Sequence, residues 1–178
     1  MEKKISRVNL EVKQGDIANQ TEMTAVVNAA NAQLRTGGGV AGAIHRQAGP
    51  ELEKECRSLA PIEPGEAVIT NAYDLPNDYV IHCLGPVYGR DKPEDKLLSN
   101  CYKNALEIAE ENNIDSIALP AISTRAFAYP LQEAAKIAVE TVVNKLANLK
   151  NINKVRFVLY TDNDLQEYQR IIKKLTTD

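Results

Sequence analysis

The sequence has 178 residues, of which 44% are hydrophobic and 25% are charged, a composition typical of a soluble globular protein with a sizeable core. Its 21 Lys and Arg against 24 Asp and Glu give a net charge of −3, so we expect no nucleic-acid partner. Since no apolar run could cross a bilayer and no signal peptide is visible, we expect one cytoplasmic domain over residues 1–178 with no membrane partner.

The cysteines and histidines are too few and too scattered for a metal centre. Cys56, Cys83 and Cys101 are odd in number, lie far apart and form no CxxC pair, which favours reduced, buried thiols over a disulfide or a zinc site. The only histidines are His45 and His82, to which we assign structural roles. No metal and no cofactor are therefore expected.

In chain order, alternating apolar residues first predict a strand at about residues 7–13. The first half continues with a turn or short helix at 19–24, a buried strand at 25–28, a helix at 40–48, a solvated helix at 51–59, and strands at 67–70 and 79–84. The second half holds an amphipathic helix at 94–112, a strand at 116–119, a helix from near Pro130 with the proline in its first turn, a strand at 155–160, and a last helix through 175 that Asp162 or Asn163 caps.

The alternation of helix and strand in the second half favours an α/β fold with a mostly parallel sheet covered on both faces. Ligands of such sheets bind beyond the carboxyl ends of the strands. Two informative loops follow strands, one around Gly37–Gly39 and one at residues 123–129. We therefore expect both loops to line one crevice.

The stretch from Asn28 to His45 is the part of the sequence that says most about a ligand site. A buried strand ends at Asn28, a polar loop carries Asn31, and Gly37–Gly39 stand directly before a helix. Glycines there let backbone N–H groups approach a ligand with no Cβ in the way, and the helix N-terminus favours an anion. A flexible turn is the alternative, but the two asparagines ahead of the glycines also suit a ligand.

The glycines formally satisfy G-x-G-x-x-G with Gly37, Gly39 and Gly42, but the context of a dinucleotide-binding fold is missing. Eight residues separate the strand from Gly37, where that fold has its first glycine directly after the strand. No acid ends a second strand about 20 residues later, and no Gly-Lys-Ser/Thr follows as in a P-loop. The loop indicates a phosphate-bearing ligand that neither common nucleotide fold explains.

Several motifs occur together in an order and spacing that resembles the macrodomain family of ADP-ribose-binding modules. They are Gly-Asp-Ile at 15–17, Val-Val-Asn-Ala-Ala-Asn at 26–31, the glycine segment at 37–45, Tyr-Val-Ile-His at 79–82 and Pro-Ala-Ile-Ser-Thr at 120–124. The resemblance covers about residues 8–175. It implies a three-layer α/β/α sandwich around a mixed, mostly parallel central sheet, with ADP-ribose or a derivative as ligand.

For the adenine end of that ligand, the resemblance assigns three residues. Asp16 would accept a hydrogen bond from the adenine amino group, with the Ile17 backbone beside it. A plain turn aspartate is the alternative reading. Tyr160, at the end of the last strand, would stack on adenine, and a core tyrosine is an equally good interpretation.

For the other end, the resemblance assigns the two loops. Asn31 would hold the distal ribose, since an amide both donates and accepts hydrogen bonds, unless it only forms an Asx-turn. The distal ribose and phosphate would lie on Gly37, Gly38, Gly39 and Val40. The second loop would wrap the diphosphate, with its phenyl ring on a ribose, through Ser123, Thr124, Arg125, Ala126 and Phe127.

Ala41 departs from the pattern of one hydrolytic branch of the family, which has an acid there in a Gly-Val-Asp-Gly context. Other members, including viral ones, have Gly-Val-Ala-Gly as here and resemble de-ADP-ribosylating enzymes. Without the acid, the phosphate of the ligand would hold a water against the anomeric carbon of the distal ribose while Asn31 orients the sugar.

The diphosphate loop also departs from the family, which usually has Ser-Thr-Gly-x-x-Gly where this chain has Arg125 and Ala128 at the glycine positions. If these positions need a positive φ, each side chain costs about 1–2 kcal/mol. The Arg125 guanidinium would bind the diphosphate or point to solvent beside a reshaped loop. The third alternative is an occluded cleft that has lost its ligand.

Three functions follow. As an enzyme, which we slightly favour, the chain would hydrolyse O-acetyl-ADP-ribose or an ADP-ribosyl ester on a mono-ADP-ribosylated protein; Asn31 and the intact glycines support this function and the next one equally. As a reader, it would bind ADP-ribose without turnover. As a degenerate member, it would bind another nucleotide or nothing.

Overall fold

The computed structural model describes residues 1–177 and contains a seven-stranded sheet with the strand order β1-β2-β7-β6-β3-β5-β4. The strands are β1 (Glu2–Ile5), β2 (Val8–Gln14), β3 (Ala25–Ala29), β4 (Ala67–Asn71), β5 (Tyr79–Cys83), β6 (Ser116–Leu119) and β7 (Lys154–Leu159). Five neighbouring strands are parallel, while β1 and β4 pair antiparallel at the two edges. The prediction of a mixed, mostly parallel sheet is confirmed.

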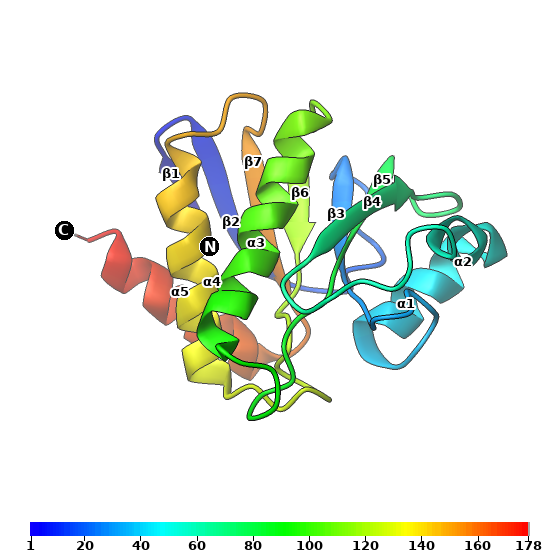
Figure 1. Cartoon of the computed structure of the whole chain (residues 1–178). Helices are drawn as coiled ribbons and strands as arrows, with labels where there is room; N and C mark the ends of the chain where they lie inside the picture. The colour runs from blue at the N-terminus through cyan, green and yellow to red at the C-terminus, as the bar shows by residue number, and fades with distance from the viewer. Residues whose placement is uncertain (178) are drawn as a thin grey trace.

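The helices form an outer layer on each face of the sheet (Figure 1). They are α1 (Gly39–Ala48), α2 (Pro50–Cys56), α3 (Glu94–Glu111), α4 (Leu131–Leu146) and α5 (Asp162–Leu175). The core on one face includes residues of α3, α4 and α5, and the core on the other face includes residues of α1 and α2. The three-layer α/β/α sandwich is therefore confirmed.

The alternation of side chains along the central strands supplies both cores. In β3, Ala25 and Val27 belong to the core under α3, α4 and α5, whereas Val26 belongs to the core under α1 and α2. The adjacent β6 repeats this, since Ile117 pairs with Ala25 and Ala118 with Val26. A strand buried on both faces is apolar at nearly every position, which explains the hydrophobic run from Ala25 to Val27 ahead of the buried Asn28.

The first strand, β1, was not predicted from the sequence. Its residues alternate between exposed and half-buried, so it has no fully buried face that would produce an apolar pattern. Backbone pairing with β2 holds it, and the Met1 ammonium group donates to the Val12 carbonyl oxygen at 3.0 Å. An edge strand of this kind can be identified from its pairing with β2 in the structure, but not from its amino-acid composition.

The ends of three helices also differ from prediction. Helix α2 was predicted to continue to residue 59, but it ends at Cys56 and residues 57–59 form a turn. Pro130 is the N-cap of α4 and not a residue of its first turn. The cap of α5 is Thr161, whose Oγ1 accepts a hydrogen bond from the Asp164 backbone N at 3.2 Å. Neither Asp162 nor Asn163 caps that helix, because both lie inside its first turn.

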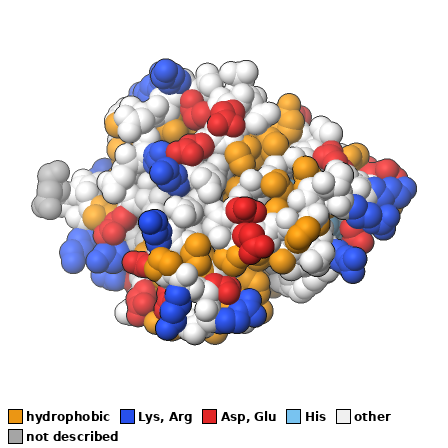
Figure 2. Space-filling view, in the orientation of Figure 1, with side chains coloured by type: hydrophobic (Ala, Val, Ile, Leu, Met, Phe, Trp, Pro, Cys, Tyr) orange, Lys and Arg blue, Asp and Glu red, His pale blue; other side chains and the backbone are white. Residues whose placement is uncertain are grey.

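The predicted state of the three cysteines is confirmed by the structure. Cys56, Cys83 and Cys101 are all buried free thiols, as predicted. The described helices include none that is long and apolar enough to span a membrane. Over the face covered by α3 and α4, Figure 2 shows basic and acidic side chains interspersed with one another.

His82 is fully buried in β5, where its neutral ring takes part in a chain of hydrogen bonds. Asn28 Nδ2 donates to its Nδ1 at 3.0 Å, so Nδ1 carries no proton. Nε2 therefore donates to Thr70 Oγ1 at 2.9 Å, and that hydroxyl donates to the Asn71 carbonyl oxygen at 3.0 Å. Burial, with a smaller contribution from His45, lowers the pKa of His82 to about 3.

We predict that His82 makes the free energy of unfolding fall as the pH drops below about 6.5, the pKa of an unfolded histidine. The unfolded chain takes up a proton there, whereas folded His82 does so only near pH 3. In this window each pH unit removes up to about 1.4 kcal/mol. Urea unfolding of the chain and of His82→Gln, whose amide keeps both hydrogen bonds, should give a shallower pH dependence for the variant. Equal slopes would contradict a neutral buried histidine.

Candidate functional site

Two adjoining cavities lie beyond the carboxyl ends of the parallel strands. The smaller one, about 280 Å³, lies between the start of α1 and the loop after β6 and includes Asn31. The larger one, about 550 Å³, extends to Asp16 and Tyr160 beyond β2 and β7. They form one continuous cleft, because both are lined by Gly39, Val40, Ala121, Thr124 and Arg125.

All the residues that the sequence predicts to contact a ligand line this cleft. The larger cavity has Asp16, Ile17 and Tyr160. The smaller cavity has Asn31, Gly37, Gly38, Ser123, Ala126 and Phe127, and the shared wall includes Gly39, Val40, Thr124 and Arg125. The glycine loop and the loop after β6 therefore line one crevice as expected, while the role of each residue stays a prediction.

The start of α1 presents uncapped backbone to the cleft. Its N-cap is Gly38, no side chain caps it, and its first turn has no acidic residue. A Cβ added at Gly38 or Gly39 would meet no atom within 4 Å, so the space above these residues is open. Gly39 has a φ of +55°, a left-handed conformation that favours glycine. The first N–H groups of a helix lack helical partners, so this end suits an anion.

Gly42, one turn further, allows the glycine loop to pack on its own helix. A Cβ there would lie 2.3 Å from the Gly37 carbonyl oxygen and 2.9 Å from Arg46 Nη1. Arg46 lines the larger cavity and adds a positive charge to it, which the sequence reasoning missed. The sequence signal that could have found Arg46 is its spacing of four residues from Gly42, which puts both residues on the same face of α1.

The side-chain amide of Asn31 forms two hydrogen bonds within its own loop. Its Oδ1 accepts from the Arg35 backbone N at 3.0 Å, and its Nδ2 donates to the Arg35 carbonyl oxygen at 2.8 Å. The turn-forming alternative for Asn31 is thus present in the structure, although the side chain still lines the smaller cavity. A ligand would share these hydrogen bonds or replace them.

At the far end of the cleft, Asp16 and Tyr160 differ in how they are held. Asp16 is exposed and forms a turn in which its Oδ1 accepts from the Ala18 backbone N at 2.9 Å. Tyr160 is 80% exposed because β7 ends at Leu159, so the tyrosine lies just beyond the carboxyl end of that strand. The interpretation of Tyr160 as a core residue is wrong, and its ring is accessible to a ligand.

Arg125 forms an ion pair across the cleft wall with Asp164 in the first turn of α5. The Asp164 side chain is 5% exposed, and the Arg125 side chain is 57% exposed. The guanidinium is therefore anchored instead of simply pointing to solvent, and the cleft beside it is open. Sequence reasoning missed Asp164, since no local pattern joins residues 39 positions apart.

Of the two replaced glycines, only Ala128 has the conformation that favours glycine. Its φ is +60°, while Arg125 is absent from the residues with positive φ. The turn is closed by hydrogen bonds of 2.9 Å from Ala128 N to Arg125 O and from Tyr129 N to Ser123 O. Ser123 also has a positive φ, of 67°, and its buried Oγ has no hydrogen-bond partner among residues 1–177. The predicted strain thus applies to Ala128.

A family model, the Macro domain, matches residues 27–138, more than half of the chain. The chain belongs to the macrodomain family. It is 48% identical over 158 residues to a macro domain-containing protein of Chlorobaculum tepidum, covering 88% of this chain and 91% of that protein. It is 46% identical over 170 residues to the O-acetyl-ADP-ribose deacetylase of Klebsiella pneumoniae, covering 93% of this chain and 97% of that enzyme.

The same family is found among solved structures. The macrodomain of Oceanobacillus iheyensis with ADP superposes with a TM-score of 0.95 at 39% identity, covering 99% of this chain and 96% of that one. The resemblance that the sequence motifs indicated, and the fold that it implied, are therefore confirmed.

We predict that Ala128→Gly raises the free energy of unfolding by about 1 kcal/mol, because glycine adopts the left-handed conformation without a Cβ clash. Urea unfolding measures this change. The matched control is Ala126→Gly in the same loop, where φ is not positive. It should lower stability by about 0.5 kcal/mol through the entropy of the unfolded chain. A loss of stability in both variants would contradict the strain at Ala128.

Proposed function

We propose that this macrodomain binds ADP-ribose in the cleft and hydrolyses esters of ADP-ribose, either O-acetyl-ADP-ribose or an ADP-ribosyl ester on a mono-ADP-ribosylated protein. The observation that carries the proposal is the junction of the two cavities, where the uncapped start of α1 faces Arg125. A dinucleotide-like ligand needs an anion site in its middle and polar groups at both ends, here Asp16 and Asn31. The relative named O-acetyl-ADP-ribose deacetylase supports the ester as substrate.

Arg125 is the residue that we propose binds the diphosphate. Its ion pair with Asp164 fixes the guanidinium before a ligand arrives, so that little side-chain entropy is lost on binding. A charge-assisted contact to phosphate is roughly twice as strong as a neutral hydrogen bond. Arg46 on the same cavity adds positive charge. Together the two arginines take the place of the close backbone approach that glycines at 125 and 128 would allow.

The proposed reaction uses no general base from the protein. Two carboxylates line the described cleft: Asp16 in the larger cavity, away from Asn31, and Asp164, which is paired with Arg125. For an ADP-ribosyl ester, a water held by the phosphate of the ligand attacks the anomeric carbon. The bond from that carbon to the ester oxygen breaks, the protein carboxylate leaves, and the proton of the water passes to the phosphate. Asn31 orients the ribose, so positioning and electrostatics supply the acceleration.

A reader without turnover is the second candidate, and Ala41 favours it. The position faces the smaller cavity, where a carboxylate would activate water, yet alanine offers no proton acceptor. Binding of ADP-ribose without release of product from an ester would identify this function. The third candidate is a chain that binds another nucleotide or nothing, and the open cleft speaks against a chain that binds nothing.

We predict that ADP-ribose binds with a measurable heat in titration calorimetry and more tightly than AMP or NAD, and that Arg125→Gly weakens its binding by about tenfold, as expected for one charge-assisted contact. Arg125→Gly leaves the Asp164 carboxylate without its partner. The double variant Arg125→Gly/Asp164→Asn also removes this charge, and we expect it to bind ADP-ribose as weakly as the single variant does. The control is Arg57→Gly at the exposed end of α2, outside both cavities.

Tighter binding by Arg125→Gly would mean that the guanidinium obstructs the site. No binding by the unaltered chain would contradict the proposed function as a whole.

We also predict that Asn31→Ala lowers turnover of an ADP-ribosyl ester by about 100-fold through lost orientation of the ribose. Affinity should fall by less than about tenfold, since one neutral hydrogen bond is lost. Release of free ADP-ribose measures turnover. Asn112→Ala is the control, because its Nδ2 also donates to a backbone carbonyl, that of Ile108 at 2.8 Å, at the distant end of α3. Unchanged turnover in Asn31→Ala would contradict the assigned role.

A further inference from the structure

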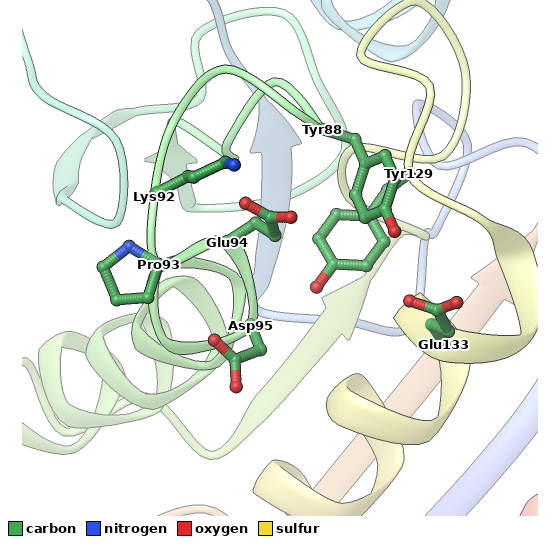
Figure 3. Close-up of a pocket in the computed structure, with 7 residues that line it drawn as sticks. All are labelled: Tyr88, Lys92, Pro93, Glu94, Asp95, Tyr129 and Glu133. Carbon is green, nitrogen blue, oxygen red and sulfur yellow. The ribbon is translucent and has the colours of Figure 1, made fainter.

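Arg156, inside β7, is a buried charge that lines neither part of the cleft. Its side chain is 4% exposed. It also lies outside the separate hollow of about 570 Å³ that Figure 3 shows with its tyrosines and acidic side chains. A buried ion pair often stabilises a fold no better than apolar side chains of the same volume. A role for Arg156 beyond stability therefore has to come from what the guanidinium holds in place.

On one side, Arg156 is bound to the neighbouring strand. It is the direct partner of Glu11 of β2 in the sheet, and its Nε donates to Glu11 Oε2 at 2.5 Å. Two further cations, Lys13 and Lys154, have their Nζ atoms 3.9 and 3.8 Å from the carboxylate of Glu11. Neutralising Glu11 thus needs only a positive charge, and a lysine ammonium would serve. A guanidinium adds further donors in a fixed plane.

Those further donors reach the loop between β2 and β3. Arg156 Nη1 donates to Gln20 Oε1 at 3.1 Å, and Nη2 donates to Glu22 Oε2 at 2.6 Å. Because a guanidinium has only donors, it fixes which end of the Gln20 amide faces it. The Nε2 end is then free to donate, and it does so to the Asp16 carbonyl oxygen at 2.7 Å. Arg156 is therefore joined to the backbone of Asp16 through one buried side chain.

Asp16 presents its carboxylate to the larger cavity. Its Oδ1 accepts from the Ala18 backbone N at 2.9 Å, which leaves Oδ2 for a ligand. Since the Asp16 side chain is exposed, the direction of its carboxylate depends on the backbone turn to which Gln20 donates. The orientation of this acceptor in the cleft thus goes back to a residue of the sheet interior.

The loop also has anchors that do not involve Arg156. At its start, the Gly15 backbone N donates to a carbonyl oxygen of β7 at 2.9 Å. Further along, Asn77 Nδ2 donates to the carbonyl oxygens of Gln20 and Met23 at 2.8 and 2.6 Å. These hydrogen bonds hold the loop on the sheet, so a change at position 156 would shift the carboxylate without detaching the loop.

We propose that Arg156 is a positioning residue that acts through Gln20 to aim the Asp16 carboxylate, and that it thereby makes the larger cavity selective for a base with an exocyclic amino group. The inference rests on the proposed function, with the adenine of ADP-ribose in that cavity. An analogue without the amino group leaves the carboxylate unpaired and binds more weakly. This discrimination depends on direction, because hydrogen bonds weaken steeply when donor and acceptor are misaligned.

The test is titration calorimetry of the full chain with ADP-ribose and with the analogue whose base is unsubstituted purine, which lacks only the amino group. We expect the unaltered chain to bind ADP-ribose about tenfold more tightly, as for one hydrogen bond to a charged group. Arg156→Lys keeps a cation against Glu11 but loses the second donor group that reaches Gln20. It should reduce the ratio of the two affinities to about twofold and leave the affinity for the purine analogue unchanged.

Gln20→Glu is the second variant. Its carboxylate still accepts from Arg156 but has no proton to donate to the Asp16 carbonyl oxygen, so the ratio should fall to about twofold here as well. The matched control is Glu22→Gln at a 62% exposed position, which changes another partner of Arg156 and leaves the link through Gln20 intact. Its ratio should stay at about tenfold.

The ratio separates positioning from a merely structural role. A residue that only stabilises the loop would weaken both ligands alike, so an unchanged ratio in Arg156→Lys or in Gln20→Glu would overturn the proposal, whether or not the affinities themselves fall. Equal binding of the two ligands by the unaltered chain would overturn it too, because Asp16 would then not contact the amino group. Binding of neither ligand by the unaltered chain would contradict the proposed function itself, and this inference with it.

Discussion

Parallel pairing of β2, β7, β6, β3 and β5 is the constraint on which the rest of the structure depends. It brings the carboxyl ends of five strands to one edge, and the loops that leave them have to share the space beyond it. Residues that are far apart in the sequence, such as Asp16, Asn31, Arg125 and Tyr160, line one cleft for this reason. The chemistry of the site is therefore a consequence of topology before it is a consequence of any single side chain.

Arg125 and Ala128 show that replacing two glycines in one loop has two different physical effects. Ala128 has a left-handed φ and bears the conformational cost of its Cβ. Arg125 does not, and its effect is electrostatic, because it places a cation at the junction of the cavities and takes Asp164 as a partner. On our proposal that Arg125 binds the diphosphate, a guanidinium in this loop would do the work of backbone donors at the glycine positions.

The sequence was most informative where burial produces a pattern of apolar residues. The strand at Ala25–Ala29, buried on both faces, and the helix at Glu94–Glu111, buried along one stripe, were predicted from such patterns. The motifs around the cleft were enough to predict that its lining residues lie together. Three features were not predicted, for different reasons. The edge strand β1 has no fully buried face that would produce an apolar pattern. The cap at Thr161 has two other capping residue types, Asp162 and Asn163, directly after it. The ion pair of Arg125 joins residues 39 positions apart. One domain over residues 1–178 and a cytoplasmic location stay predictions, as do the roles of the cleft residues.

The hydrogen bond between Asn28 and His82 has a consequence for how β3 and β5 are aligned, since the two residues are direct partners in the sheet. A slip of two residues would preserve the in-and-out alternation of both strands, so apolar burial alone does not oppose it. It would, however, leave a buried amide and a buried imidazole facing aliphatic side chains without partners. This polar pair therefore selects one register, and with it the place at which the chain leaves β3 and begins the glycine loop.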